Sequence, residues 1–223
     1  MSLRALLLDL DGTLVDTNAT HTDAWMDAFQ ARGYRPAREA VASAIGMGGD
    51  KLVPHLLGAE ADAEDGDALR EMQGEQFRAR ARATRFAFIE GAEALLAAAR
   101  TRGLQTAICT SGSQANLDAL FTSAPADLRE RVDLVTTADD VDGSKPDPDV
   151  LHAALRQLDV EPGASLLLGD TLYDLEAARR AGVPFIGVTT WVWTTADFEA
   201  RGARQTIEDL TPLAADLDAV GDY

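Results

Sequence analysis

The sequence predicts an α/β protein with a Rossmann-like parallel-sheet core and a small all-helical domain inserted after the first strand. Along most of the chain, short apolar runs alternate with helical patterns, which is the order of βαβ units in a parallel sheet. Residues 17–86 break this alternation, because they are helical in composition and contain no apolar strand run. We therefore expect a discontinuous core of residues 1–16 and 87–223 around a helical domain of residues 17–86.

The expected strands of the core are apolar runs that are short and nearly continuous, as in a sheet buried on both faces. They are "ALLLDLD" (5–11), "TAICT" (106–110), "VDLVTT" (132–137), "SLLLGD" (165–170) and "PFIGVTT" (184–190). The expected helices between them are 92–103, 113–123, 149–160 and 172–182. Gly103 and Gly182 stand where a helix commonly ends in a left-handed residue, so they mark two of these boundaries.

The insertion contains two long helical patterns, "NATHTDAWMDAFQARGY" and "EDGDALREMQGEQFRARARATRF". Asp16 and Thr17 are expected to cap its first helix. The chain leaves the core directly after Asp16 and must return near residue 87. The two crossings therefore flank the end of the first strand.

The charge of the chain disfavours two classes of partner. Its formal net charge is −17 and its pI is about 4.4. Such a surface repels nucleic-acid phosphates and anionic lipids, so we expect neither nucleic acid nor membrane as a partner. A local site can still be positive inside a negative protein.

The single cysteine and the N-terminus bear on location. Cys109 alone cannot form an internal disulfide, and it lies in the apolar run "TAIC", so we interpret it as a core residue and not as a nucleophile. No segment approaches the roughly 18 apolar residues that span a bilayer. The first residues do not follow a secretion-signal pattern. These observations predict a cytoplasmic protein.

Polar side chains follow four of the predicted core segments, at the sheet edge where ligands of parallel sheets bind. They are Asp9 and Asp11, then Thr110 and Ser111, then Lys145, and finally Asp170 and Asp174. Like charges this close in sequence require a cation, a proton or solvent between them. Clustered carboxylates suit a hard divalent cation such as Mg²⁺.

These residues carry a family resemblance. "DLDGTLVDT", Thr110, Lys145 with Pro146, and "GDTLYD" resemble the four motifs of the haloacid dehalogenase superfamily, in the family's order and across the whole chain. The helical insertion resembles the first cap type of that superfamily, which phosphoglycolate phosphatases and β-phosphoglucomutase share. The resemblance implies a Rossmann-like core with a cap domain at residues 17–86.

The resemblance also implies roles for the acidic residues. Asp9 would be the nucleophile that forms an aspartyl-phosphate. Asp11 would protonate the leaving oxygen and later activate water, while its backbone carbonyl joins the metal shell. Asp9 and Asp170 would bind Mg²⁺ directly, and Asp174 would bind it directly or through an intervening group.

A second set of residues would hold the phosphate. Thr110, with the backbone amides of Gly12 and Ser111, would cradle the phosphoryl oxygens, and Lys145 would offset their negative charge. In the insertion, Lys51 and His21 are candidate substrate contacts. For both, the alternative is a structural role: a surface lysine at a helix start, and a histidine at the hinge or an interface.

Differences between this sequence and the motifs of related enzymes favour one type of reaction. Asp11 is absent from haloacid dehalogenases proper and is replaced in phosphonatases, so its presence argues for phosphate esters. The "GMGGDK" stretch resembles the one that holds the phosphonatase lysine, but Asp11 counts against that activity. Gly49 lies near the place where β-phosphoglucomutase has an arginine, which favours hydrolysis over phosphate transfer within a sugar.

The sequence thus predicts a Mg²⁺-dependent phosphatase acting on a small phosphorylated metabolite, as a monomer or weak homodimer. A β-phosphoglucomutase-like phosphomutase is the nearer alternative. A phosphate-binding protein without turnover is the more distant one, because binding alone needs neither a nucleophile nor an acid.

Overall fold

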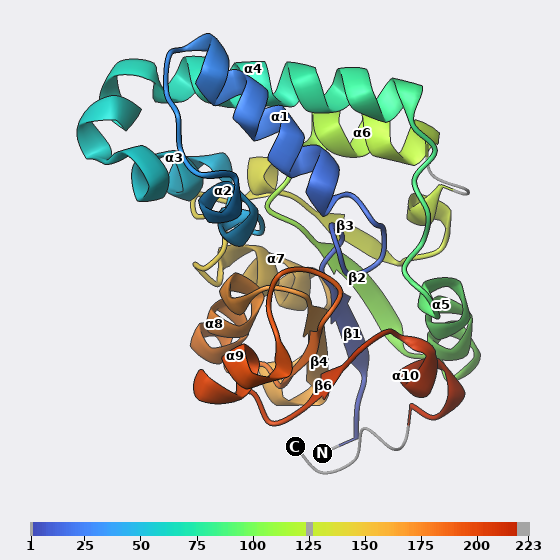
Figure 1. The fold of residues 1–223 in the computed structure, drawn as a ribbon. Helices are drawn as coiled ribbons and strands as arrows, with labels where there is room; N and C mark the ends of the chain where they lie inside the picture. Colours follow the sequence, from blue (N-terminus) through green and yellow to red (C-terminus); the bar gives the residue numbers. More distant parts are fainter. Residues whose placement is uncertain (1, 124–126, 218–223) are drawn as a thin grey trace.

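The computed structural model describes residues 2–123 and 127–217. Its centre is a six-stranded parallel sheet in the order β3-β2-β1-β4-β5-β6 (Figure 1). The strands are β1 (Ala5–Leu8), β2 (Gln105–Cys109), β3 (Leu134–Thr136), β4 (Ser165–Gly169), β5 (Phe185–Val188) and β6 (Thr206–Ile207). The predicted Rossmann-like sheet is confirmed. The sequence did not indicate β6, because two residues make no recognisable apolar run.

Helices cover both faces of the sheet, with α5 and α10 on one side and α7, α8 and α9 on the other (Figure 1). The helices of the core are α5 (Ala92–Thr101), α6 (Gln114–Ser123), α7 (Asp149–Leu158), α8 (Leu172–Ala181), α9 (Thr195–Ala200) and α10 (Thr211–Ala215). The described residues of the core also form short 3₁₀ turns at η1 (Leu128–Glu130), η2 (Ala138–Asp140) and η3 (Pro162–Ala164).

The leucines of β1 show why its sequence is continuously apolar. Leu6 and Leu8 pack in the cluster on the α5 face, whereas Ala5 and Leu7 pack in the cluster on the α7 and α8 face. Successive side chains of a strand point to opposite faces, so a central strand covered on both sides must be apolar at every position.

Between β1 and α5 the structure places four helices: α1 (Asn18–Ala31), α2 (Arg38–Ala44), α3 (Gly49–Leu57) and α4 (Ala59–Ala83). They share a cluster of buried residues that includes Trp25, Phe29 and Leu69. Farther along α4, Phe77 and Ala81 instead pack in the cluster that covers the sheet, and α4 runs beside α6 (Figure 1). One long helix therefore ties the insertion to the core.

The two crossings between the insertion and the core lie side by side. The Asp16 N–H donates to the Ala87 carbonyl at 3.0 Å, and the Ile89 N–H donates to the Leu14 carbonyl at 3.0 Å. Two further hydrogen bonds join α2 to the core. Trp191 Nε1 donates to the Ala42 carbonyl, and Tyr173 Oη donates to the Ser43 carbonyl, each at 2.9 Å.

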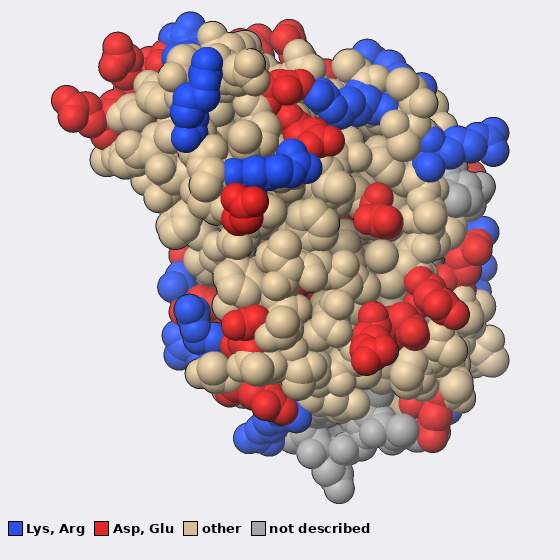
Figure 2. All heavy atoms as spheres, in the orientation of Figure 1, with Lys and Arg blue, Asp and Glu red and all other residues tan. Residues whose placement is uncertain are grey.

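Acidic and basic side chains are interspersed on the face shown in Figure 2, and both occur over the helical insertion. The insertion also contains ion pairs between its own helices, such as Arg80 with Asp27 and Arg38 with Asp23. Within residues 2–123 and 127–217, no helix combines the length and the apolar character that crossing a membrane requires.

Candidate active site

The loop after β1 turns back tightly over the end of the sheet. Asp9 is still held in the sheet, because its N–H donates to the Leu168 carbonyl at 2.9 Å. Gly12 has φ +83°, a left-handed conformation that glycine adopts without steric cost. A β-carbon at Gly12 would overlap the side chains of Asn18 and Asp170. The glycine therefore allows the β1 and β4 loops to approach each other closely.

Three buried carboxylates meet at this edge. Asp9, Asp170 and Asp174 each offer an oxygen, and these atoms lie within 4.8 Å of one another. The fully buried Lys145 Nζ lies 2.5 Å from Asp9 Oδ1 and 2.6 Å from Asp174 Oδ1. One ammonium against three carboxylates leaves an excess of negative charge. Crowded, buried oxygen ligands of this kind fit a hard divalent cation such as Mg²⁺.

The pKa values of the cluster follow from burial and mutual charge. Burial raises the pKa of Asp9 to about 7; Lys145 counteracts the rise, and Asp174 adds to it. Burial, together with the Asp9 and Asp174 charges, raises the pKa of Asp170 well above its ordinary value. Burial opposes the charge of Lys145, but Asp174 and Asp9 outweigh it and raise the Lys145 pKa. A bound cation would favour the ionised carboxylates and reverse their rise.

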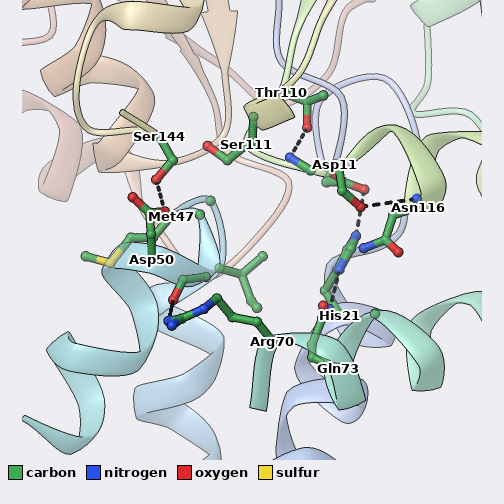
Figure 3. A pocket seen from close by; sticks show the side chains of 18 of the residues that line it. Asp11, His21, Met47, Asp50, Arg70, Gln73, Thr110, Ser111, Asn116 and Ser144 are labelled. Carbon is green, nitrogen blue, oxygen red and sulfur yellow. Dashed lines mark hydrogen bonds and ion pairs between the residues drawn. The ribbon is translucent and has the colours of Figure 1, made fainter. Parts of the chain in front are cut away.

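Asp11 has a separate set of contacts on the side facing the insertion (Figure 3). Thr17 Oγ1 donates to Asp11 Oδ1 at 2.5 Å, and His21 Nε2 lies 3.1 Å from the same oxygen. The His21 ring is held in turn: Gln73 Nε2 lies 3.2 Å from its Nδ1, and the Phe77 ring stacks on it at 3.9 Å. Burial would raise the pKa of Asp11, but His21 and Thr17 outweigh it and lower the pKa.

Thr17 differs from its predicted capping role. It stands at the N-cap of α1, but its side chain makes no hydrogen bond to the first turn of that helix. Its hydroxyl is directed to the Asp11 carboxylate instead. The pattern of an acid and a threonine before a helix predicts a cap, whereas the fold uses this threonine to orient a site residue.

The β2 loop brings Thr110 and Ser111 to the same cavity as Asp9 and Asp11. Thr110 Oγ1 accepts the Gly112 N–H at 2.9 Å, and Ser111 Oγ accepts the Lys145 N–H at 3.3 Å. These bonds fix the loop that follows β2. Gly12 does not line this cavity; its carbonyl accepts a hydrogen bond from Thr190 at 2.5 Å.

The cavity itself has a volume of about 560 Å³ and lies between the strand ends and the insertion. Its core side includes Asp9, Asp11, Thr110, Ser111, Asn116 and Ser144, and its insertion side includes His21, Trp25, Met47, Arg70, Gln73 and Arg78. Figure 3 shows two places where side chains from the two sides meet, Asp11 with His21 and Ser144 with Asp50. This volume suits a small metabolite.

The sequence analysis missed two arginines of α4. Gly66, Arg70, Gly74 and Arg78 follow one another at four-residue intervals, which places them on one face of the helix. A β-carbon at Gly66 would lie 2.6 Å from Arg70 Nη2, and one at Gly74 would lie 2.6 Å from Arg78 Nη1. Each arginine therefore folds back over the glycine one turn before it. This glycine–arginine spacing was the available signal.

The two arginines differ in their partners. Arg70 is paired with Asp62 at 2.7 Å and with Asp67 at 2.9 Å. Arg78 Nη1 donates to Asn116 Oδ1 of α6 at 3.0 Å. In the part of the chain that the structure describes, no ion pair joins Arg78 to a carboxylate.

Lys51, predicted as a substrate contact, lies outside the cavity. Its Nζ is 2.8 Å from Asp147 Oδ2, and it is not among the residues that line the cavity. The neighbouring Asp50 does line the cavity and bonds to Ser144. The structural alternative weighed for Lys51 therefore describes it better in this conformation, because Asp147 holds it on the surface.

Comparison with known proteins agrees with this geometry. Residues 6–188 match the family model described as haloacid dehalogenase-like hydrolase. Protein CbbY of Cereibacter sphaeroides is 32% identical over 221 residues, covering 95% of this chain and 94% of that protein. Validoxylamine A 7'-phosphate phosphatase of Streptomyces hygroscopicus subsp. limoneus is 30% identical over 223 residues, with 94% and 95% covered.

Among solved structures, a hydrolase from Pseudomonas syringae superimposes with a TM-score of 0.89 at 27% identity, over 98% of this chain and 99% of that one. The sheet order and the helical insertion are therefore those of a known hydrolase fold. With a family model that covers most of its length, this chain belongs to the haloacid dehalogenase-like hydrolases.

Proposed function

We propose that this protein is a Mg²⁺-dependent phosphatase that hydrolyses a small phosphate monoester through an aspartyl-phosphate intermediate. The observation that carries the proposal is the placement of Asp9 and Asp11 in one cavity with Thr110, above the buried Lys145. A carboxylate that attacks a phosphate must overcome charge repulsion, and this edge of the sheet supplies a buried ammonium next to that carboxylate.

In the first step, an Asp9 oxygen attacks phosphorus, the bond from phosphorus to the leaving oxygen breaks, and Asp11 donates a proton to that oxygen. In the second, water attacks the phosphorus of the acyl phosphate and Asp11 accepts its proton. The bond between Asp9 and phosphorus then breaks, which releases phosphate and restores both carboxyl groups. His21 and Thr17 hold one Asp11 oxygen, so they orient the carboxyl group for both transfers.

Asp9, Asp170 and Asp174 would hold Mg²⁺, with the Asp11 backbone carbonyl as a further oxygen. When bound, the ion would neutralise charge that develops on the phosphoryl oxygens. Thr110 and the amide of Ser111 would contact the same oxygens. The structure does not favour the amide of Gly12 for this cradle, because the Gly12 N–H donates to the Val15 carbonyl at 2.7 Å and Gly12 does not line the cavity.

We also infer that residues 17–86 act as a cap over the core formed by residues 1–16 and 87–223. Two hydrogen-bonded crossings flank the end of β1, as a hinge requires, and Trp191 and Tyr173 bond to α2 across the interface. Closure over the cavity excludes water and strengthens the electrostatic interactions around Asp9.

The leaving group of the substrate would carry a second anionic or strongly hydrogen-bonding group. Arg78 supports this, because it lines the cavity and, within residues 2–123 and 127–217, its side chain bonds only to the neutral Asn116 side chain. Arg70 is a weaker candidate, since two aspartates already neutralise it.

Phosphate release from a panel of phosphate esters, with and without a second anionic group, tests the proposal. We expect release that requires Mg²⁺, stops in excess chelator, and is faster for the esters with the second group. Conversion of a sugar phosphate to its isomer without release would establish the phosphomutase alternative. Tight phosphate binding with no turnover of any ester would establish the non-catalytic alternative.

A further inference from the structure

Asn18 connects the insertion to the carboxylates of the core. It is the first residue of α1, and it is 1% exposed. Its Nδ2 donates to Asp170 Oδ2 at 2.7 Å, across 152 residues of sequence. Gly12 lies against both side chains, in a position where a β-carbon would overlap them. The contact therefore depends on a glycine in the β1 loop.

Two side chains donate hydrogen bonds to the Asp170 carboxylate. Thr13 Oγ1 donates to its Oδ1 at 3.3 Å, while Asn18 donates to its Oδ2. Thr22 Oγ1 donates to the Asn18 carbonyl at 2.9 Å, a bond at the start of α1 that involves neither Asp170 nor the Asn18 carboxamide. Because two side chains orient the Asp170 carboxylate, it has little conformational freedom left to lose when it binds a cation.

The other polar atom of the carboxamide is the acceptor Oδ1. Asn18 Oδ1 is buried and accepts no hydrogen bond from the described residues. A buried acceptor that is left unpaired costs folding free energy, and such atoms in native proteins commonly indicate a bound water or ion. Oδ1 and Nδ2 share one carbon, so this acceptor lies beside the Asp170 carboxylate. A hydrated cation at the acidic cluster would bring water to this position, because Mg²⁺ usually retains several waters.

We propose that Asn18 is a positioning residue of the Mg²⁺ site, with two separable contacts. Nδ2 orients the Asp170 carboxylate, and Oδ1 accepts a hydrogen bond from a water on the ion. The inference rests on the proposed Mg²⁺ site but not on turnover or on the identity of the substrate. The competing explanation is that Asn18 only links α1 to the core.

Binding of Mg²⁺ to the metal-stripped protein, measured by calorimetry without substrate, separates the two explanations. Asn18→Ala removes both contacts and should weaken Mg²⁺ binding about 10–100-fold, the usual effect of losing an outer-sphere partner. Asn18→Asp keeps an oxygen that can accept from the water but loses the donor to Asp170, so it should bind Mg²⁺ more weakly than wild type and more tightly than Asn18→Ala. Thr22→Val is the matched control, because it loosens the same helix start without touching Asp170, and it should leave the affinity unchanged.

The Mn²⁺ spectrum in electron paramagnetic resonance gives a second measurement, since it reports the symmetry of the ion's ligands and should change in Asn18→Ala but not in Thr22→Val. Folding of each variant is checked by circular dichroism. Folded Asn18→Ala with wild-type affinity would overturn the inference. Asn18→Asp as weak as Asn18→Ala would overturn the water contact, and wild type that binds no Mg²⁺ would overturn the proposed metal site itself.

Discussion

The two sides of the cavity are built in different ways. On the core side, Asp9, Asp170 and Lys145 stand within two residues of a strand or in a loop between elements, and burial and mutual charge fix them. On the insertion side, His21 extends from the first turn of α1 and Arg78 from the last third of α4, and each is held by one or two hydrogen bonds. We infer that the rigid side performs the chemistry and that the helical side orients and selects. Five measurements test this division.

The largest effect is expected at Asp9. Asp9→Asn should abolish turnover of an aryl phosphate, because an amide cannot replace the carboxylate as nucleophile. Asp23→Asn, at a half-exposed ion pair with Arg38, is the control and should keep wild-type activity. Steady-state kinetics of both proteins provide the measurement. Turnover in Asp9→Asn within tenfold of wild type would remove Asp9 from the reaction.

Asp11 should matter somewhat less. Asp11→Asn is expected to slow hydrolysis of an alkyl phosphate by roughly 10²–10⁴, the usual contribution of a positioned acid or base. A leaving phenol of low pKa departs without a proton. With such an aryl ester, the rate of the phosphorylation step in Asp11→Asn should return toward that of wild type. Burst kinetics on both esters measure that step. Equal losses would show that Asp11 does not act as the acid.

His21 tests whether the insertion reaches the chemistry through Asp11. His21→Phe keeps a ring against Phe77 and removes the contact with the Asp11 carboxylate. Because Asp11 would then be misplaced relative to the substrate, kcat/KM should fall up to about 100-fold. The interaction lowers the Asp11 pKa, so its loss should raise that pKa. Carboxyl carbon NMR of Asp11 follows the shift, with the exposed His55→Phe as control. An unchanged Asp11 pKa would contradict the coupling.

Arg78 and Lys51 form a matched pair of cations, one inside the cavity and one held outside it. Arg78→Ala should lower kcat/KM roughly tenfold for esters with a second anionic group, the effect of losing one charge-assisted hydrogen bond. Lys51→Ala should change no ester by more than about twofold, because Asp147 already holds this lysine. A larger loss in Lys51→Ala than in Arg78→Ala would reverse the assignment.

The smallest effect on activity is expected at Cys109, behind the core side of the cavity. Burial raises its pKa to about 11, so the native thiol should resist disulfide reagents at pH 8. The folded pKa lies above the ordinary value of 9.0, so the folded state retains the proton more tightly. Its contribution to the free energy of unfolding should be lost between pH 9 and 11. Denaturation against Cys109→Ala measures this, and rapid native labelling would contradict it.

The sheet could be predicted because local sequence determines its strands, and the residues of the acidic cluster could be named because they follow core segments that end at one edge of a parallel sheet. A strand buried on both faces needs apolar residues at every position, and parallel strands end at the same edge. Asp9, Asp11, Thr110, Lys145, Asp170 and Asp174 could therefore be named from the sequence, and the resemblance to the family implied their roles. β6 could not be predicted, because two residues paired to β5 carry no pattern of their own.

Tertiary structure alone decided which side chains of the helices face the cavity. The spacing of Lys51 did not reveal that Asp147 would hold it, and the place of Thr17 before α1 did not reveal its bond to Asp11. Likewise, the contact between Asn18 and Asp170 joins residues 152 positions apart, across two loops that Gly12 allows to meet. Sequence patterns report the period and burial of single elements. Contacts between elements depend on how those elements pack, so only the folded chain shows them.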